Sequence, residues 1–250
     1  MSIRMVRMCP SFLSGMFAPA QTPQLSILHL MLWTFCSAVY LSLMRAVFSI
    51  QGELPDEYAG IQGATSVIQG IFTGAVLMGA LVLVSTRVRS GPPMLRQPGH
   101  WLLFVSALFN LTCLPFILSA MLLQNSHLDG TVLVMPALIA LYLVPTIAHV
   151  FAAAHQRLRR WKIVFIALAV TGLVQCFAYA AIYGFNSWIG ILFTIHSLGN
   201  LLIPVAVLVL SIIDLAAGRR YDWLHWTGVT THVAGASLTL LWIIGTFSIH

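Results

Sequence analysis

The chain has 250 residues, of which 59% are apolar and only 7% are charged, and its mean hydropathy is +0.93. Soluble domains carry about a quarter charged residues, so this composition excludes a water-soluble globular protein. The net charge of +6 comes from basic residues spread over several loops rather than from one patch, which argues against nucleic-acid binding. We expect an all-α, polytopic helical membrane protein with no soluble module.

The charged residues divide the sequence into long uncharged intervals. A transmembrane helix needs about 20 apolar residues to cross about 30 Å of hydrocarbon, and each interval is long enough for one helix. The longest interval holds two, because the turn-forming residues 183–187 interrupt it. The sequence therefore predicts a single domain, 25–250, that is a bundle of seven transmembrane helices at 25–46, 61–85, 101–123, 131–154, 163–183, 188–213 and 223–247.

The first 24 residues are predicted to be a short cytoplasmic tail. Arg4 and Arg7 precede a mildly apolar stretch and the small residues 18–20, a pattern that loosely resembles a secretory signal. Pro10 and Gly15 interrupt the apolar stretch, and cleavage would place the basic loops on the outer face. We therefore interpret residues 1–24 as a tail rather than as a signal.

The basic residues indicate the orientation of the helices, because cytoplasmic loops are enriched in Lys and Arg. All of them except Arg45 fall in the tail or in the second, fourth and sixth loops. The other loops contain the acidic residues Glu53, Asp56, Glu57 and Asp129. We expect the amino terminus in the cytoplasm, the carboxyl terminus outside, and a location in the cytoplasmic (inner) membrane.

Small residues at four-residue spacing predict close helix packing. Gly70 and Gly74 form a G-x-x-x-G motif, and Gly228 and Gly235 make a similar groove in the last helix. We expect these glycines to pack helices within the bundle rather than to join two copies of the chain.

Several polar residues fall within the predicted helices at one depth. Gln69, Gln175 and His196 each lie about 12 Å below the outer edge. Asn200 and Pro204 share a helix face with His196, and Pro204 cannot donate a hydrogen bond to the carbonyl of Asn200. This arrangement predicts a polar ligand-binding pocket formed by His196, Asn200, Gln69 and Gln175, or alternatively hydrogen bonds that join helices.

Three intramembrane histidines, His29, His149 and His232, fall nearer the cytoplasmic side. Neutral imidazole is a common axial ligand of haem, so these residues are candidate ligands of one b-type haem. His225 and His232 are about 10.5 Å apart along one helix, which is too far for chelation of a single ion. Hydrogen-bonded or interfacial histidines are the other interpretation, and we expect no metal site.

The sequence contains no motif for a known membrane chemistry. Its one lysine, Lys162, falls at a helix end, which excludes a retinal Schiff base, and protease and ATPase motifs are missing. The sequence therefore favours a non-enzymatic module without catalytic residues or cofactor, either a small-solute permease or a partner or sensor subunit. The alternative is a membrane oxidoreductase subunit that binds haem b. Expected partners are the lipid bilayer and another membrane protein or a second copy of the chain.

Overall fold

The computed structural model describes residues 26–51, 56–90, 95, 97–124, 130–182 and 189–247. The tail 1–24, Glu53, Asp129 and the turn at 183–187 lie outside the described residues. All regular structure in the described part of the chain is helical, as predicted. Its helices are α2 (Ile27–Gln51), α3 (Asp56–Ser90), α4 (Pro98–Gln124), α5 (Gly130–His155), α6 (Arg159–Ile182), α7 (Ile189–Ala216) and α8 (Trp223–Phe247).

Five stretches within the described residues are long and apolar enough to cross a membrane. They are Ile27–Ala46, Gly63–Ser85, Leu138–His155, Arg159–Ala181 and Ile189–Ala216. The outer surface of the bundle is also apolar: Ile163 and Phe177 on α6 are 67% and 58% exposed. Exposed apolar side chains on this scale indicate a surface that faces lipid.

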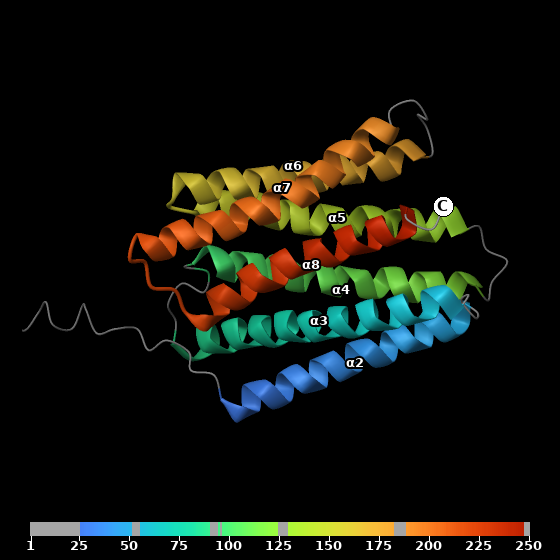
Figure 1. Cartoon of the computed structure of the whole chain (residues 1–250), viewed down its shortest axis with the longest axis horizontal. Coiled ribbons are helices and arrows are strands. Elements are labelled where there is room, and N and C mark those ends of the chain that lie inside the picture. Colours follow the sequence, from blue (N-terminus) through green and yellow to red (C-terminus); the bar gives the residue numbers. More distant parts are fainter. Residues whose placement is uncertain are drawn as a thin grey trace, which may run out of the picture.

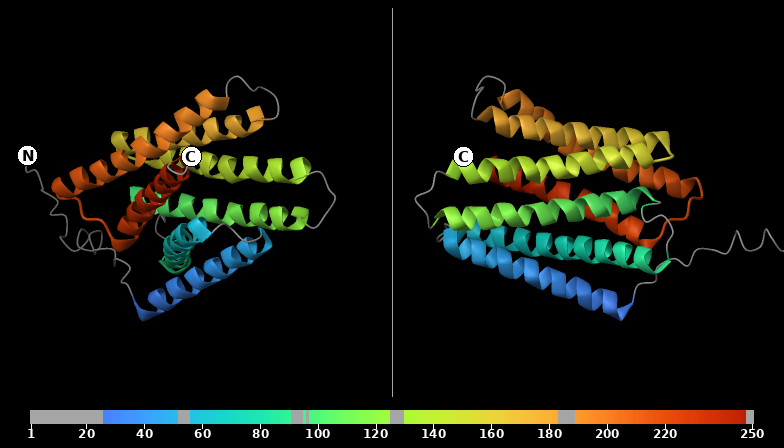
Figure 2. Two further views of the ribbon diagram at one scale, coloured as in Figure 1. Left: turned by 45° about the vertical axis from the view of Figure 1, so that its right-hand side comes forward. Right: turned by 180° about the vertical axis from the view of Figure 1, so that it is seen from behind.

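The helices form two rows with one helix at the edge (Figure 1). One row is α4, α5 and α6, and the other is α3, α8 and α7, so that α8 lies at the centre of its row. α2 packs against the outer side of α3, and the view from behind shows it at the edge of the bundle (Figure 2). Side chains of both rows line a cavity between them, with α5 on one side of it and α8 on the other.

Glycines set the closest contacts between helices. A Cβ atom added at Gly70 would meet the side chain of Leu41, and one at Gly74 would lie 3.0 Å from the Cα of Ser37. On α8, Gly228 packs against the backbone of Gly99 on α4. The prediction that the G-x-x-x-G motif packs helices within the bundle is confirmed, because its partner is α2 of the same chain. The prediction is wrong for Gly235, where an added Cβ would meet no atom of the described residues within 4 Å.

Two groups of buried apolar side chains hold the bundle together. The larger joins α4, α5, α6, α7 and α8, and its most buried members include Trp161, Phe165 and Val207. The smaller joins α3, α4 and α8 through residues such as Leu103 and Leu224. Between them, the two groups fix the positions of the six helices that surround the cavity.

Candidate functional site

A cavity of about 380 Å³ lies between the two rows of helices. Described residues of six helices, α3 to α8, form its wall. None of the described residues that line it is Asp, Glu, Lys or Arg. Its polar lining consists of Gln69, Thr73, Ser106, Asn110, Tyr142, Thr146, His149, Thr171, His196, Asn200, Thr231 and His232.

One face of α7 supplies the residues that the sequence placed together. His196, Asn200 and Pro204 recur at four-residue spacing, and all three line the cavity. Asn200 Nδ2 donates to His196 Nε2 over 2.8 Å. The neutral His196 ring therefore carries its proton on Nδ1. Gln69 of α3 lines the same cavity, so three of the four residues predicted to form a pocket line one cavity.

The fourth predicted residue, Gln175, lies elsewhere. It is buried on α6, with 3% of its surface exposed, but it is not part of the cavity wall. Its Oε1 has no hydrogen-bond partner among the described residues. The sequence grouped Gln175 with His196 because both were expected at the same depth. Depth does not give the direction in which a side chain leaves its helix, and this direction keeps Gln175 out of the cavity wall.

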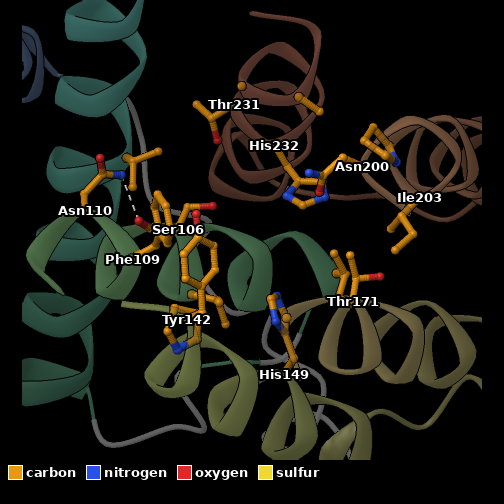
Figure 3. A pocket seen from close by; sticks show the side chains of 18 of the residues that line it. Ser106, Phe109, Asn110, Tyr142, His149, Thr171, Asn200, Ile203, Thr231 and His232 are labelled. Carbon is orange, nitrogen blue, oxygen red and sulfur yellow. Dashed lines mark hydrogen bonds between the residues drawn. The ribbon is translucent and has the colours of Figure 1, made fainter. Parts of the chain in front are cut away.

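Two of the three candidate haem ligands also line the cavity. His149 of α5 and His232 of α8 enter it from opposite sides (Figure 3). His232 Nε2 has no partner among the described residues. His29 is not among the described residues that line the cavity. Its Nδ1 accepts a hydrogen bond from the Ser26 amide over 3.0 Å, and its ring lies 5.8 Å from that of Trp223.

The sequence did not predict most of the polar residues that line the cavity. Thr73 donates to Asn110 Oδ1 over 3.2 Å, joining α3 to α4, and Asn110 Nδ2 donates to the Ser106 carbonyl over 2.8 Å. The available signal was spacing: Gln69 and Thr73, and likewise Ser106 and Asn110, are four residues apart and share a helix face. Hydroxyl and amide residues at this period mark the side of an apolar helix that faces the bundle interior.

Glycines bring α5, α6 and α7 close together around the cavity. A Cβ atom at Gly172 would meet Thr146 Oγ1, and one at Gly199 would lie 2.7 Å from Thr171 Oγ1. Small residues thus allow two threonines to sit where helices touch, and both threonines also reach the cavity wall.

A second polar region lies at the end of the bundle where α5 leads into α6 and α7 into α8. Asp214 is fully buried there. Its Oδ2 accepts from Trp161 Nε1 over 2.8 Å and from the Tyr221 hydroxyl over 2.6 Å, and its Oδ1 pairs with Arg160. Burial raises the pKa of Tyr221, an effect that nearby Arg219 and Arg160 oppose. This carboxylate is satisfied on several sides, which is typical of a structural role.

Asp222 forms a neighbouring contact between α4 and α8. Its carboxylate oxygens lie 2.9 and 3.1 Å from His100 Nε2, and Oδ1 also accepts from the His225 amide over 2.9 Å, as an N-cap does. The Gly99 amide donates to His225 Nδ1 over 2.9 Å, so the neutral His225 ring carries its proton on Nε2. Burial alone would raise the pKa of Asp222, but these donors and the nearby imidazoles lower it overall.

Neither region has the composition of a metal centre. Across the described residues, no group of three or more His, Cys, Asp or Glu side chains could hold a metal ion.

Comparison with protein-family models, curated proteins and solved structures finds no match to this chain. The cavity can offer hydrogen bonds and apolar contact to a molecule, but its described wall offers no ionic side chain to a charged one.

Proposed function

We propose that the chain crosses the cytoplasmic membrane seven times and binds a small uncharged solute in the cavity between its helix rows. α4 and α8 contain 27 and 25 residues, lengths of about 40 Å and 37 Å that are sufficient to cross a bilayer. With these two added to the five apolar stretches, all seven helices span. The basic residues Arg157, Arg159, Arg219 and Arg220, exposed at one end, support a cytoplasmic location of that end.

One observation carries the proposal: a cavity of about 380 Å³ inside an apolar bundle has polar side chains from six helices and no charged residue in its described wall. Ligand cavities in proteins measure about 300 to 1,000 Å³, so the volume is sufficient for a small organic molecule. A charged ligand would lose its hydration without gaining a counter-ion, at a cost of several kcal/mol. An uncharged polar solute avoids that cost, so the ligand is an uncharged solute.

A small-solute permease is the form of this function that we favour over a sensor or partner subunit. The test is solute flux into vesicles that contain the purified full-length protein, followed by light scattering, with glycerol and urea as separate probes. The permease predicts a permeability to at least one probe several times that of protein-free vesicles. Equal permeability with and without protein for both probes would contradict the permease and leave binding without transport, as in a sensor.

A cavity-filling variant ties any flux to this site. A Cβ atom at Gly235, which lines the cavity, would have no atom of the described residues within 4 Å, so Gly235→Leu should be accommodated and should narrow the space. Gly63→Leu is the matched control, because Gly63 has equally open surroundings and does not line the cavity. We expect Gly235→Leu to abolish the flux and Gly63→Leu to keep it.

A haem-binding oxidoreductase subunit is the second candidate. The observation in its favour is that His149 and His232 enter one cavity from opposite helices. The described wall, however, has no Arg or Lys to pair with the two propionates of haem. An absorption spectrum of the purified protein separates the two candidates, because a Soret band that His149→Leu and His232→Leu both remove requires haem, and its absence favours the solute.

A further inference from the structure

Two histidines line the cavity without a hydrogen bond to any of the described residues. His149 of α5 and His232 of α8 point toward one another from opposite sides of the cavity (Figure 3). His232 Nε2 is buried and has no partner in the described part of the chain. A neutral imidazole has one N–H group and one bare, basic nitrogen. Each ring therefore has a basic nitrogen that the described residues do not use.

The third imidazole of the wall is already engaged. Asn200 Nδ2 donates to His196 Nε2 over 2.8 Å, so the basic nitrogen of His196 has a donor. The other ionisable side chain in the described wall is the phenol of Tyr142, and no Asp, Glu, Lys, Arg or Cys occurs there. His149 and His232 are thus bases with neither a hydrogen-bond donor nor a carboxyl group beside them among the described lining residues.

The absence of carboxylates from the described wall determines how these bases can act. An imidazolium in such a wall would lack a counter-ion, which is costly in an apolar interior, so both rings are neutral before a ligand binds. A ligand that brings a proton together with a negative charge removes this cost. The ring accepts the proton, the ligand becomes the counter-ion, and the net charge of the site stays zero. A weak acid is a ligand of this kind.

The amide groups of the wall suit a carboxyl group. Asn110 Nδ2 donates to the Ser106 carbonyl over 2.8 Å, and Asn200 Nδ2 donates to His196. Each amide nitrogen has two N–H bonds, so each keeps one that can donate to a carboxyl oxygen. Phe109, which lines the same cavity, offers apolar contact to the rest of the molecule. The wall therefore contains bases for an acidic proton and donors for carboxyl oxygens.

We propose that the cavity binds a small monocarboxylic acid together with its acidic proton, and that His149 and His232 supply the base. The O–H bond of the acid breaks, the proton joins a ring nitrogen, and the carboxylate stays beside the imidazolium, with no other reactant. This inference rests on the proposed binding of an uncharged solute and names the class of that solute. Above about pH 5, where a free carboxylic acid is ionised, the same complex forms from a carboxylate and one proton.

Benzoic acid and benzamide test the chemistry, because they have the same ring and nearly the same shape, but benzamide is not an acid. Titration calorimetry of the full-length protein in detergent, repeated in two buffers of different ionisation enthalpy, measures the protons taken up per ligand bound. We expect about one proton for benzoic acid and none for benzamide. The dissociation constant of benzoic acid should rise about tenfold per pH unit between about pH 6 and pH 8, while that of benzamide stays constant.

A double variant tests the two histidines. His149→Gln combined with His232→Gln removes both basic nitrogens and keeps polar side chains of similar size. We expect this variant to take up no proton and to bind benzoic acid at least about tenfold more weakly at about pH 6. Benzamide should still bind, which shows that the cavity is intact. His155→Gln is the matched control, because His155 is on α5 like His149, is exposed, and is not among the residues that line the cavity.

The proton count on the unmodified protein decides the inference even if the double variant does not fold. Equal binding of benzoic acid and benzamide without proton uptake, abolished by Gly235→Leu, would overturn the acid preference while the solute-binding cavity stands. Proton uptake that persists in the folded double variant, or that is lost in His155→Gln, would also overturn the inference. Binding of neither compound, with flux of glycerol or urea, would overturn the inference alone. Binding of neither, with no flux, would overturn the proposed function as well.

Discussion

A single buried carboxylate organises one end of the molecule. Asp214 has no exposed surface and accepts hydrogen bonds from Trp161 and Tyr221 as well as pairing with Arg160. Removal of one partner from a buried ion pair is costly, because the other charge then lacks compensation. The groups that contact Asp214 come from α6 and from the segment that leads into α8, so this residue joins α7 to α6 and to the connection between α7 and α8.

We predict that Asp214→Asn lowers the free energy of unfolding by about 3 kcal/mol, because the amide places hydrogen atoms where Arg160 requires an acceptor. Reversible unfolding of the purified protein in mixed micelles would measure this change. Arg219→Gln is the control, since Arg219 is 42% exposed and its Nε lies 3.6 Å from Asp214 Oδ1. That variant should cost less than about 1 kcal/mol, and an equal cost for both would contradict a special role of the buried carboxylate.

Asp222 predicts a dependence of stability on acidity. Its pKa is lower in the folded protein than its ordinary value, because hydrogen bonds from His100 and the His225 amide outweigh the effect of burial. A carboxylate with a lowered pKa stabilises the fold above its unfolded pKa of about 3.9, and that contribution is lost as the pH falls through the folded value. We expect the melting temperature to fall below about pH 4, and to fall less steeply in Asp222→Asn. Identical profiles for the two proteins would contradict this linkage.

At the scale of helices, the contact between α2 and α3 depends on a glycine. Because a Cβ at Gly74 would come within 3.0 Å of the Ser37 backbone, Gly74→Ala must move α2 away, and we predict a loss of about 1 to 3 kcal/mol of stability. Gly63→Ala lies on the same helix with open space around its Cβ, and its higher helix propensity should leave stability unchanged or slightly raised. Equal unfolding free energies for the two variants would rule out tight packing at Gly74.

The positions of the helices could be predicted from the sequence because charge interrupts helices that are apolar on every side. The predicted helix at 223–247 coincides with α8, and the predicted 188–213 differs from α7 only at its ends. α3 extends from Asp56 to Ser90, beyond the predicted 61–85, because a helix continues past the membrane edge wherever its backbone hydrogen bonds are undisturbed. Intervals between charges give the apolar part of a helix and not its full length.

The cavity could be predicted only in part. The four-residue spacing of His196, Asn200 and Pro204 correctly predicted the part of the cavity wall that α7 forms, because the helical repeat determines which residues of one helix share a face. The rest depends on which faces of six helices meet, and a helix that is apolar all round carries little sign of this. Gln175 and His29 show the limit of the prediction: each was grouped with other residues by its expected depth, and neither is among the described residues that line the cavity.

The molecule as a whole has two unlike ends. At one end, Arg157, Arg159, Arg219 and Arg220 are exposed around the buried contacts of Asp214 and Asp222. At the opposite end of the molecule, α2 ends and α3 begins. Arg45 is exposed there, near the carboxyl end of α2, and α3 begins with Asp56 and Glu57. Exposed arginines interact well with anionic headgroups, and their concentration at one end favours one orientation in the membrane.

We predict that the end with the four exposed arginines faces the cytoplasm and that the carboxyl terminus lies outside. Single cysteines at Arg157 and Ser187, in a chain whose native cysteines are replaced, would report the two sides through a reagent that does not cross the membrane. Ser187→Cys should be labelled in intact cells, and Arg157→Cys only after the membrane is opened. A reporter fused after His250 should be active only outside. Labelling of Arg157→Cys in intact cells, with a reporter active only inside, would reverse the orientation, because an odd number of spans places the termini on opposite faces.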